Sequence, residues 1–408
     1  MITENIYHFI VQMCIQEKFR NNPTYYFYDL ERIRYNIQRL QSMMPQQLHL
    51  YYAMKANPHK QVMECICQED YISGIEIASA GELATAQKYI AANQIIFTGP
   101  GKTDYELEKA IADDIRFINI ESITEAVRIN NIAKRLGKDV VDVLVRINLN
   151  YCVMDGAESM SGCSTKMGID EDKYVESVKF ISSLEHIRVK GIHVFAASGV
   201  LNYESLLKVD EYIFELVHRT ECETGRIEVI DLGGGLGIDY SGEDIEFDTA
   251  SYGLQLGEML KHYQLCDREI IMELGTYLVG NAGYYTAKIV DIKQIKGKKH
   301  IIIAGGVNHM GLPLEMQRKH PLEIIPMHEP RLYPNQPFVH REFADISGPL
   351  CMVSDKLSWD DYVEHAEIGD IVVYRQAGAY CYGEGMHQFL MHPLPDEIII
   401  DESVLWNE

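Results

Sequence analysis

The chain is poor in basic side chains. Its 408 residues include 37 lysines and arginines against 60 aspartates and glutamates, so the formal net charge is −23. Because nucleic acids are bound by Lys and Arg that neutralise phosphates, this balance argues against a nucleic-acid partner. No apolar run approaches the roughly 20 residues needed to cross a bilayer. The start of the sequence lacks the basic stretch and small-residue cleavage site of a signal peptide. We therefore expect no membrane association and a reducing, cytoplasmic setting.

Common metal, disulfide and nucleotide motifs are also missing. The nine cysteines are an odd number and include no CxxC pair, so neither a disulfide framework nor a zinc site is indicated. There is no P-loop, no HExxH, and no GxGxxG that opens a βαβ unit. Core or surface positions are the simplest interpretation of His309, His387 and His392. We expect no metal.

Short apolar runs alternate with stretches of helical periodicity as far as residue 275. Eight runs are predicted strands, at residues 48–56, 74–79, 95–99, 117–122, 142–149, 189–197, 228–235 and 269–275. Helices are predicted at residues 29–43, 81–92, 104–114, 123–136, 170–184, 203–221 and 251–265. Strict alternation implies parallel strands with crossover helices. Eight units in about 250 residues fit a closed α/β barrel of the (β/α)8 TIM type, with an open doubly wound sheet as the alternative.

The pattern changes after Gly275. Strands are predicted at residues 284–293, 300–304 and near 367–375, with Gly and Pro between them, so this part is expected to be β-rich. The aromatic segment 25–29 is strand-like and could pair into it. The expected organisation is therefore an N-terminal segment over residues 1–28 that joins the β-rich domain, a barrel over 29–276, and the C-terminal β-rich domain over 277–408.

Two segments at predicted strand ends could carry chemistry. Lys55 ends the first barrel strand, in Tyr51-Tyr-Ala-Met-Lys-Ala-Asn57. Desolvation of a lysine at a barrel mouth lowers its pKa and makes a neutral amine available for a Schiff base; a solvent-exposed lysine is the alternative. Asp231-Leu-Gly-Gly-Gly-Leu-Gly237 ends the seventh strand. Its consecutive glycines allow backbone N–H groups to approach a phosphate, although a tight turn is also possible.

Three further side chains are candidates for the same pocket. Glu273 comes from the last barrel strand, where a carboxylate can point into a shared site. Gly348-Pro-Leu-Cys351 is a turn that carries a thiol, and Tyr380 follows the small residues of Gln376-Ala-Gly-Ala. Each has a plain structural alternative: a rim carboxylate, a buried inert cysteine and a packed strand end.

Together these motifs resemble the diaminopimelate/ornithine decarboxylase family of pyridoxal-phosphate enzymes (fold type III), whose members have an alanine-racemase-like barrel and a β domain. The resemblance extends from about residue 25 to residue 395, with the motifs in family order. Residues 74–83, His193-Val-Phe195 and Gly348-Pro-Leu-Cys351 are most similar to the biosynthetic branch. That branch includes carrier-protein-linked glutamate decarboxylases and decarboxylases of siderophore pathways. The resemblance implies pyridoxal 5'-phosphate (PLP) as cofactor, carbon dioxide release, and a homodimer with shared active sites.

The resemblance also implies roles for individual residues. Lys55 would hold the cofactor as an internal aldimine and Glu273 would pair with its pyridine nitrogen, which keeps the ring an effective electron sink. Cys351 and Asp355 would come from the neighbouring subunit, with Cys351 protonating Cα as a general acid. The remaining expected cofactor contacts are Glu76, Phe195, Ser198, Gly233, Gly234, Gly235, Gly275 and Tyr380, of which the glycines of the loop, Ser198 and Tyr380 would contact the phosphate.

Several positions depart from the family pattern. Phe195 stands where a histidine is usual, Glu76 replaces an aspartate, and Thr276 replaces the arginine of Glu-Pro-Gly-Arg. Met352 replaces an acidic residue that pairs with a distal substrate amine, and burying that charge unpaired would be expensive. An arginine expected near Leu312 is also missing. With Thr276, Met352 and Asp355 as predicted substrate contacts, we expect a modified or carrier-linked amino acid rather than free diaminopimelate, ornithine or lysine.

Other functions remain open from sequence. A housekeeping diaminopimelate decarboxylase keeps the same motifs. An amino-acid racemase of this fold favours an arginine at the pyridine nitrogen and a tyrosine as second base, so Glu273 and Cys351 argue against it. A non-catalytic regulator would lose cofactor contacts, and Thr276 and Phe195 could be signs of this, although Lys55 and Tyr380 are kept.

Overall fold

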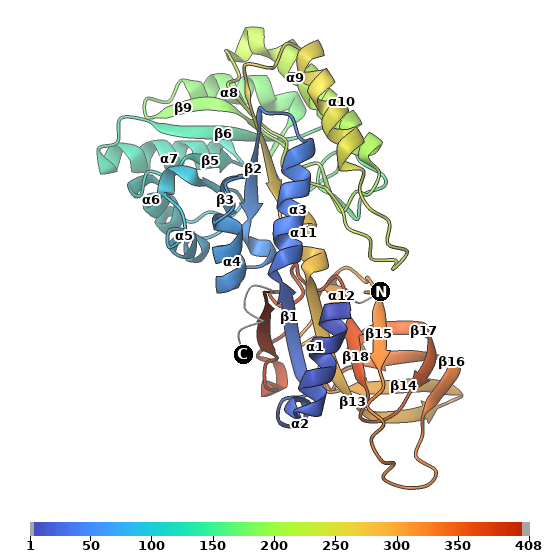
Figure 1. The fold of residues 1–408 in the computed structure, drawn as a ribbon. Helices are drawn as coiled ribbons and strands as arrows, with labels where there is room; N and C mark the ends of the chain where they lie inside the picture. The colour runs from blue at the N-terminus through green and yellow to red at the C-terminus, as the bar shows by residue number, and fades with distance from the viewer. Residues whose placement is uncertain (1–3, 402–408) are drawn as a thin grey trace. The chain divides into compact units, whose positions relative to one another are not determined.

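The computed structural model describes residues 4–401, which form two compact units (Figure 1). The first comprises residues 34–238 and 246–278. The second comprises the residues up to 33, residues 239–245, and the residues from 279 onward. Among the described residues, no helix is both long enough and apolar enough to cross a membrane.

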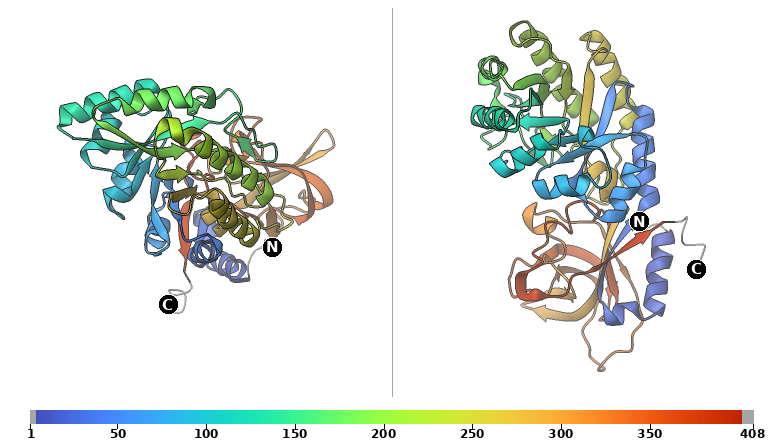
Figure 2. Two further views of the ribbon diagram at one scale, coloured as in Figure 1. Left: turned by 90° about the horizontal axis from the view of Figure 1, so that it is seen from above. Right: turned by 90° about the vertical axis from the view of Figure 1, so that its left-hand side faces the viewer.

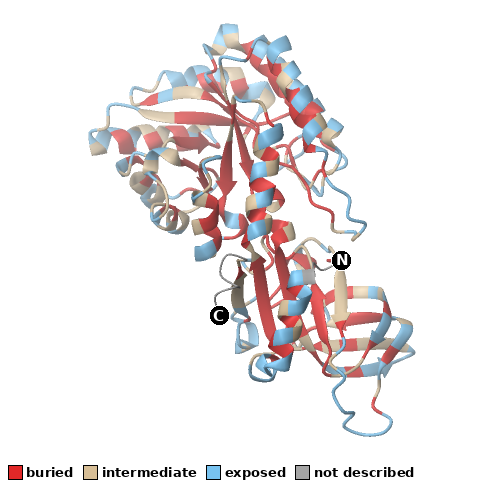
Figure 3. Cartoon of the chain, in the orientation of Figure 1, coloured by how far each residue is buried: buried red, intermediate tan, exposed pale blue. Residues whose placement is uncertain are grey.

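The first unit is built on a closed barrel of eight parallel strands. The strand order is β5-β4-β3-β2-β12-β11-β9-β6, and β6 pairs back to β5, which closes the sheet. Figure 3 shows that these strands are largely buried. The (β/α)8 prediction is therefore confirmed, and the open sheet is wrong. The strands are β2 (Leu48–Ala53), β3 (Ile72–Ile77), β4 (Ile95–Phe97), β5 (Phe117–Ile120), β6 (Val141–Asn148), β9 (Ile187–His193), β11 (Val229–Asp231) and β12 (Glu269–Leu274).

Helices connect the strands and lie outside them (Figures 1 and 2). Several begin at side-chain caps: Ser79, Thr103 and Ser122 each accept a hydrogen bond from the backbone N–H three residues later. The helices are α3 (Leu30–Met43), α4 (Lys60–Cys67), α5 (Ala80–Ala86), α6 (Asp104–Ala112), α7 (Ile123–Leu136), α8 (Tyr174–Ser182), α9 (Tyr203–Thr224) and α10 (Thr249–His262). The short strand β8 (Ile169–Asp170) adds to β6, and α11 (Thr276–Val279) follows β12.

The second unit contains a mixed sheet with the order β15-β18-β13-β14-β16-β17. The predicted strand at residues 25–29 is observed as β1, which pairs antiparallel with β13 from Thr24–Ala287 to Tyr28–Gly283. Parallel to β1 lies β19. The strands are β1 (Thr24–Asp29), β13 (Gly283–Ile295), β14 (Lys298–Ile303), β15 (Leu322–Ile325), β16 (Val339–Ser347), β17 (Lys356–Ala366), β18 (Ile371–Tyr374) and β19 (Asp396–Ile400).

Two differences from the sequence expectations have clear causes. Helix α1 (Glu4–Ile15), followed by the short α2 (Lys18–Asn21), was not predicted; Ile6, Ile10 and Met13 form its buried face in the core of the second unit. The strands predicted at 189–197 and 228–235 end earlier, at His193 and Asp231. Beyond Asp231 the chain turns at once, because Asp231 Oδ1 accepts the N–H of Gly233 at 2.9 Å.

Candidate active site at the carboxyl ends of the barrel strands

Lys55 lies in a turn directly after β2. It belongs to the 3-10 helix Met54–Ala56, and its Nζ lies 2.9 and 3.1 Å from the two carboxylate oxygens of Glu76 on β3. The Lys55 side chain is 40% exposed, whereas that of Glu76 is fully buried. Burial raises the pKa of Glu76, and the charge of Lys55 opposes that rise. Gly275 allows the end of β12 to approach this turn, since a Cβ there would lie 2.7 Å from Cβ of Ala56.

Glu273 lies in a buried cluster with His193 and Asp231, at the ends of β12, β9 and β11. Polar atoms of the three side chains lie within 4.8 Å of one another, and His193 Nε2 is 3.5 Å from Glu273 Oε2. Asn119 of β5 and Thr98, just after β4, lie 3.5 and 3.4 Å from Glu273 Oε1 and donate to it. Five strands thus supply this cluster, which could hold the polar ring atom of a cofactor or a cation.

The two acids of this cluster differ in protonation. Burial by itself raises the pKa of Glu273, but the neighbouring His193 and Lys55 outweigh it and lower that pKa to about 2. For Asp231, burial raises the pKa well above its ordinary value, and the charge of Glu273 adds to the rise. We conclude that Glu273 is the anion of this pair and that Asp231 keeps the proton.

The glycine-rich loop after β11 is a cradle that only glycine fits. A Cβ on Gly233, Gly234 or Gly235 would lie 2.4, 2.2 or 2.9 Å from a backbone carbonyl oxygen. Gly233 and Gly235 also have positive φ angles of 64° and 116°. The ring of Phe195 lies against this loop, because the same Cβ positions on Gly233 and Gly234 come within 2.8 and 3.5 Å of its carbons.

Ser198 and Thr276 border the same end of the barrel. Ser198 lies in the short strand β10 (Ala197–Ser198), which pairs with β7 (Glu158–Ser159). Its hydroxyl-bearing side chain is half-buried, as is that of Thr276, the first residue of α11. The structure therefore gathers Lys55, Glu76, Phe195, Ser198, Gly233, Gly234, Gly235, Glu273, Gly275 and Thr276 in one unit at the carboxyl ends of the strands.

The other predicted site residues belong to the second unit. Cys351 is exposed and Met352 is half-buried. Asp355 is only 2% exposed, and its two carboxylate oxygens accept the N–H groups of Val307 and Leu350 at 2.8 and 2.7 Å. Its role as a substrate contact stays a prediction. Tyr380 has a left-handed backbone, with φ of 62°, and its role as a phosphate contact stays a prediction.

His193, Asp231, Asn119 and Thr98 were missed as functional residues by the sequence analysis. The signal that could have found them is common to all four: each is a polar residue within a predicted apolar strand. Their convergence on Glu273 depends on barrel closure, which brings strands distant in sequence together.

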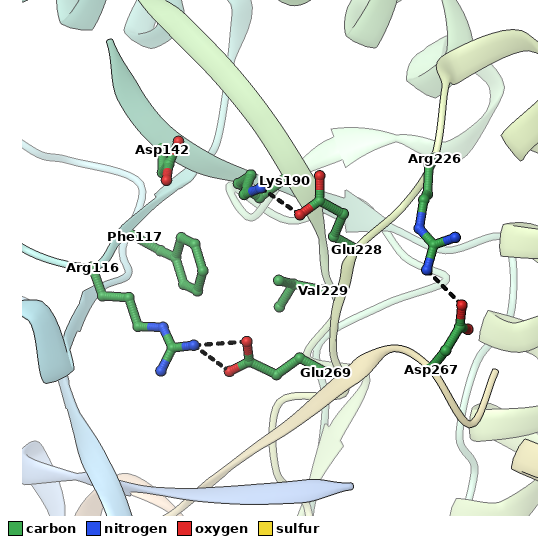
Figure 4. Close-up of a pocket in the computed structure, with 9 residues that line it drawn as sticks. All are labelled: Arg116, Phe117, Asp142, Lys190, Arg226, Glu228, Val229, Asp267 and Glu269. Atoms are coloured by element: carbon green, nitrogen blue, oxygen red, sulfur yellow. Dashed lines mark hydrogen bonds and ion pairs between the residues drawn. The ribbon is translucent and has the colours of Figure 1, made fainter.

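The amino ends of the same strands surround a hollow of about 540 Å³ (Figure 4). Its charged groups are matched: Arg116 binds both oxygens of Glu269 at 2.6 and 2.7 Å, Arg226 binds Asp267 at 2.5 Å, and Lys190 pairs with Glu228. Asp142, also on this rim, is paired with an arginine outside the hollow. The sequence analysis predicted no functional role for these residues.

Comparisons with known proteins agree with this geometry. The family model described as "Pyridoxal-dependent decarboxylase, pyridoxal binding domain" matches residues 30–280. The chain is 30% identical to 2-[(L-alanin-3-ylcarbamoyl)methyl]-2-hydroxybutanedioate decarboxylase of Staphylococcus aureus, over 97% of this chain and 98% of that protein. It is also 30% identical to the L-glutamyl-[BtrI acyl-carrier protein] decarboxylase of Niallia circulans, over 93% and 89%.

A solved structure extends the comparison. Diaminopimelate decarboxylase of M. jannaschii, in complex with L-lysine, superposes with a TM-score of 0.83 at 26% identity, over 96% of this chain and 90% of that one.

The residues present fit pyridoxal 5'-phosphate. His193 Nδ1 and Nε2, Asp231 Oδ2 and Asn119 Oδ1 are buried with no hydrogen-bond partner among residues 4–401, so the cluster has polar capacity for a ligand. The glycines after β11 carry no side chains that would cover their backbone N–H groups, and Lys55 offers an amine near Glu273. With the family model covering more than half of the sequence, the chain belongs to the pyridoxal-dependent decarboxylases and is a PLP-dependent carboxy-lyase.

Proposed function

We propose that this decarboxylase removes the α-carboxylate of a modified amino acid whose side chain ends in an amide-linked acidic group. The observation that carries the proposal is the near full-length similarity to the S. aureus enzyme, whose named substrate is an alanine joined through a carbamoyl group to a hydroxybutanedioate. Met352 supports it, because its thioether cannot pair with the distal ammonium group of lysine or diaminopimelate.

Within this proposal, Lys55 is the amine that attaches the cofactor, and Glu76 holds its Nζ in place. The cofactor supplies the electron sink for the bond to the leaving carboxylate. Glu273 is the anion that keeps the ring nitrogen protonated, and His193 and Asp231 fix its carboxylate in position. The low pKa of Glu273, about 2, supports this role, because the group stays charged throughout the working pH range.

The remaining predicted site residues have separate roles. The backbone N–H groups of Gly234 and Gly235, the hydroxyl of Ser198 and the phenol of Tyr380 bind the phosphate, and Gly233, whose own N–H is donated to Asp231, makes the turn that presents them. Phe195 offers an aromatic face to the ring. Gly275 provides the close approach of β12 to the turn of Lys55. Thr276, Met352 and Asp355 border the substrate.

Cys351 delivers the proton to Cα after carbon dioxide leaves, as a general acid. In this proposal it acts across a homodimer, so each site needs the partner subunit. Its exposure supports this, because the thiol is accessible in the isolated chain. The barrel over residues 29–276 carries the cofactor. The segments 1–28 and 277–408 form the β-rich part that carries Cys351.

The experiment is a carbon dioxide release assay on the holoenzyme with four substrates: the S. aureus enzyme's substrate, glutamate linked to an acyl-carrier protein, meso-diaminopimelate and L-lysine. We expect the highest kcat/KM with the amide-linked acid. Faster turnover of free diaminopimelate would contradict the proposal and favour the housekeeping decarboxylase, which the M. jannaschii superposition supports. Preference for the carrier-linked glutamate would mean that the substrate is delivered by a docked acyl-carrier protein and not as a free small molecule. Loss of optical activity without carbon dioxide release would indicate a racemase.

A further inference from the structure

Arg318 of the β-rich unit is held against an aromatic surface. It follows the short helix α12 (Leu312–Glu315), and its Cζ lies 4.4 Å from the centre of the Tyr240 ring. The edge of His320 packs on the same ring, with centroids 4.9 Å apart. Tyr240 belongs to this unit although it stands in the sequence only five residues after Gly235. The stacking fixes the guanidinium while its N–H groups remain able to bind a ligand.

The charge of Arg318 has no carboxylate partner within 4.0 Å among the residues that the structure describes. Its neighbours differ: Lys319 Nζ lies 2.8 Å from Asp361, and Arg375 lies 3.2 Å from Asp244. The chain carries 60 acidic residues against 37 basic ones, so most cations have an anion available. A half-buried arginine left without one is therefore placed for an anion from outside the chain.

The Tyr240 phenol interacts with the Arg318 guanidinium, but neither Tyr240 nor His320 carries a charge that would neutralise it. His320 is buried, and burial lowers its pKa to about 3, so its imidazole is neutral. Burial also raises the pKa of the Tyr240 phenol, which keeps it neutral. Tyr380 acts electrostatically on Tyr240, which places the proposed phosphate contact in the same neighbourhood of this unit. A forked guanidinium in neutral surroundings suits a carboxylate, which it binds through two parallel hydrogen bonds.

We propose that Arg318 is a specificity-determining residue that binds a carboxylate of the substrate remote from the reacting amine. This inference rests on the proposed function, because it assigns the acidic end of that substrate to one residue. It defines the substrate class as amino acids with a second, side-chain carboxylate, such as the butanedioate group of the S. aureus enzyme's substrate.

The test compares Arg318→Met with Lys319→Met in the holoenzyme. Both variants lose one positive charge at adjacent positions, but Lys319 is already paired within the chain. The substrates are the amide-linked hydroxybutanedioate and its analogue with both butanedioate carboxylates converted to amides. For Arg318→Met we expect the KM of the acid to rise about 10- to 100-fold with kcat within about threefold, and the KM of the diamide to be unchanged. Lys319→Met should change neither.

Two results would overturn the inference. An unchanged KM for the acid in Arg318→Met would show that no substrate carboxylate binds there. A loss of affinity for PLP in the apoprotein, with affinity for pyridoxal unchanged, would assign Arg318 to the cofactor phosphate instead.

A binding measurement separates this inference from the proposed function. Titration calorimetry with 2-(carbamoylmethyl)-2-hydroxybutanedioate, the acidic half alone, requires no turnover. Binding that weakens about 10-fold or more in Arg318→Met supports the inference even if the wild type releases no carbon dioxide from any amino acid. Equal binding to wild type and Arg318→Met would reject it even if the wild type is an active decarboxylase.

Discussion

The two ends of the barrel differ in how completely their polar groups are matched. At the amino ends, Arg116 is paired with Glu269 and Arg226 with Asp267. At the carboxyl ends Lys55 is paired with Glu76, but His193 and Asp231 are buried with polar atoms that have no hydrogen-bond partner among the described residues. Both ends are built from the same strands, so the difference lies in which residues stand at each end of a strand. Matched charges stabilise the chain itself, whereas unmatched buried groups are retained where a ligand completes them.

Strand β12 carries one glutamate at each end of the barrel, four residues apart. Glu269 begins the strand with its carboxylate bound twice by Arg116, and Glu273 lies near its end in the buried cluster. The same substitution at these two glutamates therefore separates stability from chemistry within one strand.

The largest expected effect is that of Lys55→Ala at the carboxyl ends. We expect kcat to fall at least about 10³-fold, because the amine that attaches the cofactor is lost. The visible absorbance band of the bound cofactor should disappear, while circular dichroism and the melting temperature of the apoprotein stay close to wild type. Lys60→Ala, a change at an exposed lysine on α4, is the matched control and should keep both absorbance and activity. A yellow, active Lys55→Ala enzyme would refute the assignment.

Glu273→Gln should follow, with kcat about 10²- to 10³-fold lower. A neutral amide cannot keep the ring nitrogen protonated, so the electron sink weakens although the space is filled. Steady-state kinetics, together with the ¹⁵N chemical shift of labelled cofactor, measure the two consequences. Unchanged protonation of the ring nitrogen in this variant would transfer the role to Asp231.

Asp231→Asn should change the pH dependence of stability. The pKa of Asp231 is raised in the folded state, so its contribution is fully present below the unfolded value and is lost as the pH rises. Unfolding of the wild-type apoprotein in urea should therefore become easier as the pH rises above the ordinary aspartate pKa, by up to about 1.4 kcal/mol per pH unit. The variant, which keeps an acceptor for the N–H of Gly233, should show a flatter profile. Parallel profiles would mean that Asp231 is ionised in the fold.

Glu269→Gln at the amino ends should have the smallest effect on activity. Loss of its paired charge with Arg116 should lower the free energy of unfolding by about 1–2 kcal/mol, since the pair is only partly exposed. Urea unfolding measures this, and kcat should remain within about twofold of wild type. If Glu269→Gln lowered kcat as strongly as Glu273→Gln, the contrast between the two ends would be refuted.

Much of the site followed from local sequence. Lys55 and Glu273 lie at predicted strand ends, and parallel strands of a barrel direct such ends to one face. The glycine loop could be recognised because its conformation excludes other residues, as the positive φ of Gly233 shows. His193 was not recognised, since a histidine within a predicted apolar run has no local property that distinguishes a core position from a site.

The second unit shows a further limit of local reasoning. Helix α1 was missed because its apolar face has meaning only against the sheet that buries it, where Ile6 and Ile10 pack with Phe27. The isolation of Arg318 was equally invisible, since the next residue, Lys319, is also basic and only the fold gives Lys319 a carboxylate.

The sequence by itself determined the alternation of strands and helices, the family and its cofactor, and the residue types able to perform the chemistry, because periodicity and short motifs are local properties. Tertiary structure decided which acid is charged and which cations are matched. Those properties depend on burial and on the distance between groups far apart in the chain: His193 reaches Glu273 only when β9 and β12 both flank β11 in a closed barrel.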